Sequence, residues 1–170
     1  MVYLCGVFFY HLKRTMIMRN ENVFCRRLSR HFTVGDLART GEAVRRGIDN
    51  VPSEGQIGRL GLLCERLLEP LRCRFGDLHL VAGYRSRRLH EALGGRGSAL
   101  HLHGEAVCLH VSSDEVGLRM CRFVEERLEF DVMWVSGRMR NGCRLLMLSF
   151  SGRRRNRGIV KIENLTKKVG

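Results

Sequence analysis

Apolar residues recur at three- and four-residue steps in two long stretches of the chain. The first stretch covers residues 53–71, and the second follows Ser113 and continues to about Leu128. This spacing places the apolar side chains on one face of a helix, so both stretches are predicted to be amphipathic helices. Pro70 is expected at or beyond the end of the first helix, because proline disrupts a helix interior. The apolar positions are Ile57, Leu60, Leu63, Leu67, Leu68 and Leu71 in the first helix and Val116, Met120, Phe123, Val124 and Leu128 in the second.

Shorter apolar runs predict strands. Residues 77–82 alternate and lead into a glycine turn, and residues 106–111 form the next short run. Two more runs, residues 130–135 and 143–150, are joined by the polar segment 136–142, which predicts a hairpin. Helices that precede a largely antiparallel sheet indicate an α+β domain, with a small sheet and flanking helices.

Two further segments contain residues that begin or end short helices. Thr33 is followed three residues later by Asp36, an order that caps the first turn of a helix. Residues 87–93 can form a short helix that Gly94-Gly95 closes, because glycine readily adopts the left-handed conformation of a helix end.

The charge of the chain is concentrated at its two ends. The 170 residues suffice for one domain, and the net charge is +13. Residues 1–31 contain six Lys and Arg and one acid, and residues 152–170 contain seven and one. We therefore predict a nearly neutral domain over residues 32–151 between a basic N-terminal extension and a basic C-terminal tail. Such tails attract polyanions, including nucleic acid.

Cysteine usage and the apolar start of the chain bear on its compartment. The seven cysteines form no C-x-x-C pair, which favours a reducing compartment and hence the cytoplasm. The opening apolar run is short, and its basic residues, Lys13 and Arg14, follow it. That order is not typical of a secretory signal, and the run is too short to span a bilayer, so no transmembrane segment is expected.

The stretch from residue 82 to residue 110 contains the most specific pattern in the sequence. It reads A-G-Y-R-S-R-R-L-H-E-A-L-G-G-R-G-S-A-L-H-L-H-G-E-A-V-C-L-H. The pattern resembles the zinc D-alanyl-D-alanine carboxypeptidases, with their S-G-Y-R-S turn, G-G pair and S-x-H-x-x-G-x-A-x-D segment. Residues 47–52, G-I-D-N-V-P, resemble a further segment of that family. The resemblance implies a hedgehog/DD-peptidase fold and a peptidoglycan peptide as substrate.

The resemblance also assigns the positions of the zinc site. Family members bind zinc through His, Asp and a second His, and a Glu acts as general base. These positions fall on His101, Cys108, Met147 and Ser136 in this chain. A cysteine thiolate is a good zinc ligand, but a thioether prefers soft metals such as Cu(I), and a serine cannot accept a proton as a carboxylate does. The pattern therefore implies a degenerate family member with little peptidase activity.

Arg85 is the candidate substrate-binding residue. The resemblance places it at the Arg of the G-Y-R-S turn, where a guanidinium can pair with a substrate carboxylate through two hydrogen bonds. The alternative role of Arg85 is to brace its own turn.

Three functions remain open at this stage. The first is an inactive homologue that binds cell-wall peptides or another carboxylate-terminated peptide. The second is a metallopeptidase whose zinc site is rebuilt from His101, Cys108 and His110, or with His103. The third is a basic nucleic-acid-binding protein, which would bind with a steep salt dependence.

Overall fold

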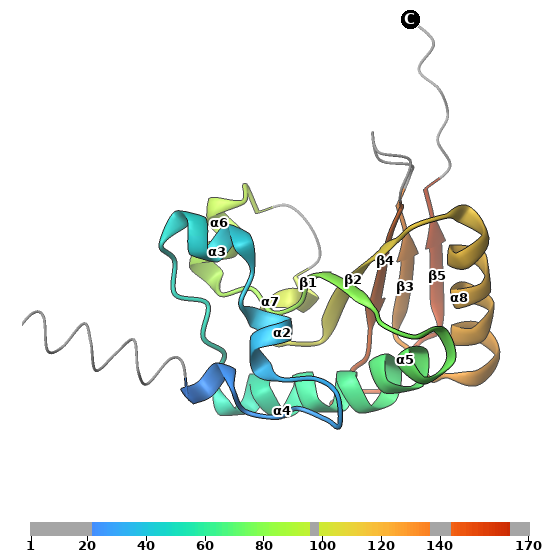
Figure 1. Cartoon of the computed structure of the whole chain (residues 1–170), viewed down its shortest axis with the longest axis horizontal. Coiled ribbons are helices and arrows are strands. Elements are labelled where there is room, and N and C mark those ends of the chain that lie inside the picture. The colour runs from blue at the N-terminus through green and yellow to red at the C-terminus, as the bar shows by residue number, and fades with distance from the viewer. Residues whose placement is uncertain (1–21, 96–98, 137–143, 164–170) are drawn as a thin grey trace, which may run out of the picture.

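One mixed sheet of five strands organises the part of the chain that this computed structural model describes, residues 22–95, 99–136 and 144–163 (Figure 1). The strand order is β1-β2-β4-β3-β5, with antiparallel pairing from β1 to β3 and parallel pairing between β3 and β5. The predicted α+β class and the predicted hairpin are confirmed. The hairpin's connection lies mostly outside the described residues. The strands are β1 (His79–Ala82), β2 (Ala106–Val111), β3 (Val132–Val135), β4 (Arg144–Ser149) and β5 (Ile159–Ile162).

The helices begin where the sequence offers capping side chains. Thr33 and Asp36 form a reciprocal capping box at α2, and the Ser113 side chain accepts a hydrogen bond from the backbone N–H of Val116 in α8. The described helices are α2 (Val34–Ala38), α3 (Gly41–Arg46), α4 (Glu54–Leu63), η1 (Cys64–Leu68), α5 (Glu69–Phe75), α6 (Arg87–Ala92), α7 (Leu100–His103) and α8 (Asp114–Arg127).

The helix predicted over residues 53–71 is longer than expected and passes through Pro70. Elements α4, η1 and α5 follow one another without a break, and η1 is a π-helical turn in which the Glu69 N–H donates to the Cys64 carbonyl. Proline lacks an N–H donor and crowds the carbonyl one turn earlier. The wider π turn directly before Pro70 relieves that crowding, so the helix continues to Phe75 instead of ending.

The two faces of the sheet have different surroundings. Alternate residues of β2 and β4, such as Val107 and Leu148, are completely buried against the helices, together with Leu60 and Leu67 of the long helix and Val124 of α8. In Figure 1 helix α8 lies alongside the strands and covers this face. The other residues of the same strands, including Cys108 and Met147, form a separate small cluster with Val132.

Both predicted tails contribute to the described fold. In the expected N-terminal extension, Leu28 joins the main core and Arg27 forms an isolated bridge with Thr33. In the expected C-terminal tail, residues 159–162 form strand β5. The basic run before β5 is neutralised in part, because Arg154 and Arg157 both donate to the buried carboxylate of Asp131 at 2.8 Å. Ion pairs to acids in the core therefore bind this segment to the domain.

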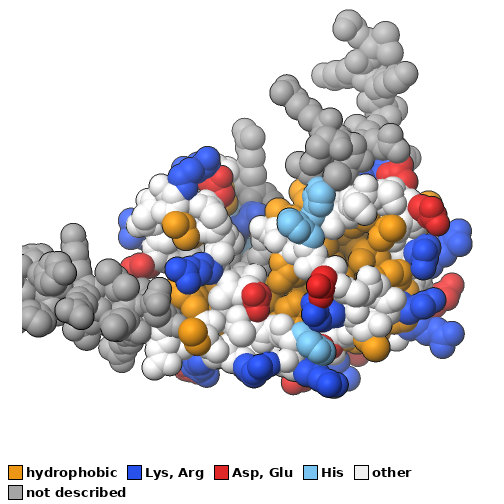
Figure 2. All heavy atoms as spheres, in the orientation of Figure 1, with side chains coloured by type: hydrophobic (Ala, Val, Ile, Leu, Met, Phe, Trp, Pro, Cys, Tyr) orange, Lys and Arg blue, Asp and Glu red, His pale blue; other side chains and the backbone are white. Residues whose placement is uncertain are grey.

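The described surface mixes charges of both signs. In Figure 2 Lys, Arg, Asp and Glu side chains are interspersed over the visible face, and hydrophobic side chains gather toward its middle. Among the described residues, no helix is long and apolar enough to cross a membrane.

Candidate functional site

The turn that carries Arg85 packs tightly against helix α2. A Cβ at Gly83 would lie 2.3 Å from the Leu37 carbonyl oxygen, so only glycine fits at this position. The Tyr84 N–H donates to the same carbonyl at 2.7 Å. This close approach fixes the backbone directly before Arg85.

Asn50 ties the same turn to its neighbours and was not singled out from the sequence. Its buried side-chain amide donates to the carbonyls of Ala38 and Tyr84, and its Oδ1 accepts from the Ser86 N–H at 2.6 Å. Each polar atom of the amide therefore has a backbone partner. The sequence signal for Asn50 was the G-I-D-N-V-P segment that resembles the family. Its asparagine positions the Arg85 turn and does not line the cavity that Arg85 borders.

His101 lies on the short helix α7, and hydrogen bonds to its side chain and to its backbone fix its orientation. Its Nδ1 donates to the Gly83 carbonyl at 2.6 Å, and its own carbonyl accepts from the Arg85 N–H at 3.1 Å. The helix ends at Gly104, where φ is +73° and a Cβ would lie 2.9 Å from the Gln56 carbonyl oxygen. A carbonyl only accepts hydrogen bonds, so Nδ1 carries the proton of the neutral ring. Nε2 is therefore unprotonated and its lone pair is available.

Cys108 faces that lone pair. Its Sγ lies 3.6 Å from Nε2 of His101, and both side chains are buried. Burial, and then the positive charge of Arg85, lower the pKa of His101 to about 4, against the opposing effect of the Gly83 and Ala106 carbonyls. Burial raises the pKa of Cys108 to about 11, with Arg85 acting in the opposite direction. At neutral pH the pair is therefore a thiol beside a neutral imidazole, not a thiolate–imidazolium pair.

Met147 completes the cluster at the family's metal positions. It is the Cα partner of Cys108 across β2 and β4, and of Trp134 across β3 and β4. Together with Arg85 these side chains surround a cavity of about 660 Å³, called the site cavity from here on. Its lining consists of Arg85, Leu93, Leu100, His101, Cys108, Val132, Trp134, Leu145, Met147, Arg157 and Lys161.

The other two predicted site residues do not line the site cavity. Ser136 lies at the end of β3, where its Oγ accepts from the Leu145 N–H at 2.9 Å. His110 lies on β2 opposite His79, with the two imidazole rings 5.4 Å apart. His103, the other candidate for a rebuilt zinc site, is exposed on α7.

Two cations that line the site cavity come from the segment expected to be a tail. Arg157 precedes β5 and Lys161 lies within it, and β5 pairs with β3 so that Lys161 is the partner of Trp134. One signal was present, the short run Ile159 to Ile162 with three apolar residues out of four, but the neighbouring arginines obscured it. All three charged side chains of the described lining are therefore positive, counting Arg85.

The residues at the metal positions do not fit the zinc site that the resemblance implies. A catalytic zinc needs three protein ligands, and among the described residues no group of three His, Cys, Asp or Glu side chains could hold a metal ion. His101 and Cys108 supply two donors, and Met147 supplies a thioether, which is a poor ligand for zinc. No hydrolytic step through zinc follows from this donor set.

Comparison with known proteins identifies the family. A sequence model described as Peptidase M15 matches residues 30–137, well over half of the chain. The matched region includes the Arg85 turn, His101 and Cys108, whereas Met147 lies beyond it. No curated protein and no solved structure matches the chain. Peptidases of this family are typically zinc-dependent, and the family includes the D-alanyl-D-alanine carboxypeptidases. The chain belongs to the peptidase M15 family.

Proposed function

We propose that this member of the peptidase M15 family binds a short peptide by its terminal carboxylate in the site cavity and does not hydrolyse it. The observation that supports this most is the charge of the described lining, which contains Arg85, Arg157 and Lys161 but no Asp or Glu. Arg157 is paired with Asp131 behind the lining, so Arg85 and Lys161 supply most of the positive charge. A cavity of one sign attracts ligands of the other. The resemblance favours a hedgehog/DD-peptidase fold for the chain. It also favours cell-wall peptides that end in D-alanine as the ligand.

Arg85 is the residue best suited to hold the carboxylate. It is half-buried at the cavity wall, and its backbone is fixed by the contacts of Gly83 and by His101. A planar guanidinium offers two parallel N–H donors to a carboxylate, an arrangement that a lysine cannot reproduce. The apolar lining, with Trp134 and Leu100, suits small side chains such as the methyl groups of alanine.

Loss of hydrolysis follows from the chemistry at the general-base position and at two zinc-binding positions. At the general-base position Ser136 has a hydroxyl that already accepts a backbone hydrogen bond, and a hydroxyl cannot accept a proton as a carboxylate does. Loss of a general base typically lowers a rate by about 10²–10⁴-fold. The zinc-binding positions offer Cys108 and Met147, so the metal that would activate water is also poorly held.

The proposal is tested by calorimetric titration with a peptide ending in D-Ala-D-Ala and with the same peptide as its C-terminal amide. We expect the acid to bind and the amide to bind at least about tenfold more weakly, because charge-assisted hydrogen bonds are worth roughly 1.5–3 kcal/mol. Arg85→Lys should weaken binding of the acid by about ten- to a hundred-fold, because lysine keeps the positive charge but cannot donate two parallel hydrogen bonds to the carboxylate. Arg88→Lys, at an exposed position of helix α6, is the matched control and should leave affinity unchanged.

Two results would refute the proposal. Equal binding of acid and amide would show that the carboxylate is not recognised. Release of D-alanine from the acid by the purified protein, abolished by a chelator, would show a working metallopeptidase.

A further inference from the structure

We propose that His101, Cys108 and Met147 form a binding site for a soft monovalent metal ion, Cu(I), in place of zinc. The three side chains line one cavity and offer an imidazole nitrogen, a cysteine sulfur that binds a metal as the thiolate, and a thioether sulfur. Thiolate and thioether ligands select Cu(I), whereas zinc sites use Cys, His and carboxylates. This inference does not depend on peptide binding by Arg85.

The spacing of the first two donors suits a shared metal. Metal bonds of about 2.0–2.3 Å at a tetrahedral angle separate two ligand atoms by about 3.6 Å. The distance between Nε2 of His101 and Sγ of Cys108 is 3.6 Å. Nε2 has its lone pair available because Nδ1 donates to the Gly83 carbonyl, and that second hydrogen bond also fixes the ring orientation.

The third donor approaches from the neighbouring strand. Met147 is paired with Cys108 in the register of β2 and β4, and both belong to one small buried cluster with Ala82 and Val132. Residues paired in an antiparallel sheet have Cβ atoms about 4.5–5.5 Å apart on the same face. The flexible thioether of Met147 can therefore reach a metal held by the other two donors.

Charge favours a monovalent ion over a divalent one. Binding replaces the thiol proton of Cys108, which is released to solvent, and the metal stays in the Cu(I) state in which it is supplied. One thiolate neutralises one Cu(I). A divalent ion would leave a net positive charge among side chains that are at most 8% exposed, beside Arg85 and with no carboxylate in the described lining. Burying an uncompensated charge is costly.

Trp134 gives a site-specific readout. It is the only tryptophan of the chain, it is the register partner of Met147, and it lines the site cavity. The intact protein is titrated anaerobically with Cu(I) held by bicinchoninate, while tryptophan fluorescence and chelator absorbance are followed together. We expect fluorescence to be quenched with saturation at one Cu(I) per chain, and Zn(II) at the same concentrations to cause no such change.

Matched variants separate this site from other thiols of the chain. Cys108→Ser should abolish the saturable quenching. Met147→Leu should lower the affinity for Cu(I) at least about tenfold, which is the lower end of the loss that follows when a group supporting a metal site is removed. Cys73→Ser removes an exposed thiol, and Met120→Leu changes a methionine with the same 7% exposure as Met147. Both controls should keep the parent affinity.

The proposal is overturned by any of three results. These are absence of saturable quenching in the parent, unchanged quenching in Cys108→Ser with thermal unfolding like that of the parent, and equal affinity of parent and Met147→Leu. If Cys108→Ser does not fold, Met147→Leu decides alone, because exchange of methionine for leucine conserves volume.

Discussion

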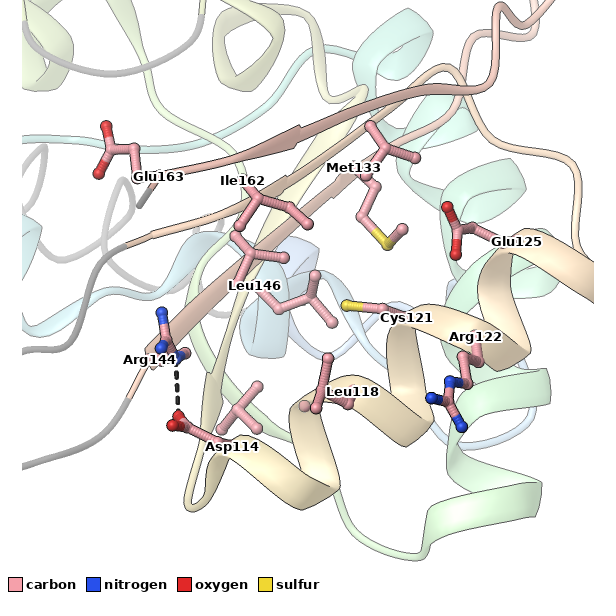
Figure 3. A pocket seen from close by; sticks show the side chains of 14 residues that line it. Asp114, Leu118, Cys121, Arg122, Glu125, Met133, Arg144, Leu146, Ile162 and Glu163 are labelled. Carbon is pink, nitrogen blue, oxygen red and sulfur yellow. Dashed lines mark hydrogen bonds and ion pairs between the residues drawn. The ribbon is translucent and has the colours of Figure 1, made fainter. Parts of the chain in front are cut away.

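The two faces of the central sheet are built from alternate residues of the same strands, yet they differ in chemistry. On the face toward α8 the hollow drawn in Figure 3 has an apolar floor that includes Leu118, Leu146 and Ile162, with charged side chains of both signs around it. At its edge Arg144 of β4 pairs with Asp114 of α8 at 2.7 Å. On the opposite face the site cavity brings together Arg85, His101, Cys108 and Met147 from separate segments.

The difference shows how one set of strands serves stability and chemistry at once. The α8 face needs only apolar side chains of suitable volume, so many sequences would serve. The cavity face needs particular donors at particular positions, and it depends on Gly83, Asn50 and Gly104 to place them. Substitution of neighbouring residues on one strand should therefore affect different properties.

The largest expected effect is a loss of stability when a buried side chain on the α8 face of the sheet is shortened. Leu148→Ala should lower the free energy of unfolding by about 2–5 kcal/mol, because Leu148 is fully buried in the core. Leu145→Ala, three residues away on the same strand, should lower it by less than about 1 kcal/mol, because this side chain is half-buried at the cavity wall. Urea denaturation of both variants measures the contrast. Equal losses would mean that the cavity face contributes to the core as the other face does.

An intermediate effect is expected at the turn before Arg85. Gly83→Ala forces a Cβ against the Leu37 carbonyl and should cost roughly 1–3 kcal/mol of stability, together with a loss of peptide binding. The matched control is Gly58→Ala, in an exposed position of α4 with no atom within 4 Å of the added Cβ. It should stabilise the protein by about 0.5–1 kcal/mol through helix propensity. Thermal unfolding compares the two variants, and tolerance of Gly83→Ala would contradict the close packing of this turn.

The smallest effect is expected from the ion pairs that hold the strand carrying Lys161. Hydrogen bonds from Arg157 and Arg154, against the effect of burial, hold the pKa of Asp131 below its ordinary value of 3.8. The carboxylate therefore stabilises the fold above pH 3.8, and this contribution is lost as the pH falls below that value toward the folded-state pKa. Asp131→Asn should cost about 1 kcal/mol at pH 7, because solvent screens the half-exposed guanidinium groups.

Denaturation of parent and Asp131→Asn between pH 7 and pH 3 tests this sign. The difference between the two proteins should shrink toward the acid end. A difference that stays constant over this range would show that the loss comes from packing rather than from the charge.

Periodicity predicted the elements whose apolar residues face one core. Strand β2 has the predicted bounds, and the helix expected to end near Leu128 is α8, which ends at Arg127. Pro70 misled the prediction of a helix end because the preceding π turn, which no local propensity encodes, accommodates it. Strand β5 was missed because its pairing with β3 and the ion pairs of the preceding arginines with Asp131 are tertiary contacts, which are not visible in the local sequence.

The site was predicted in part, and for a different reason. The family pattern named Arg85, His101, Cys108 and Met147, which line one cavity, but no periodicity in the sequence would have joined them. It also named Ser136, which accepts a hydrogen bond from the Leu145 N–H outside the cavity. His110, proposed only for a rebuilt zinc site, lies against His79 instead. Arg157 and Lys161 were missed because a run of basic residues reads as a solvated tail until tertiary contacts are known.

The zinc content of the purified protein tests the central claim most directly. Elemental analysis should find no stoichiometric zinc in the parent chain, because Cys108 and Met147 replace two ligands of the family pattern. The variant with Cys108→Asp and Met147→His restores that pattern beside His101 and should retain about one zinc per chain. One zinc per parent chain, together with release of D-alanine from a wall peptide, would contradict the account.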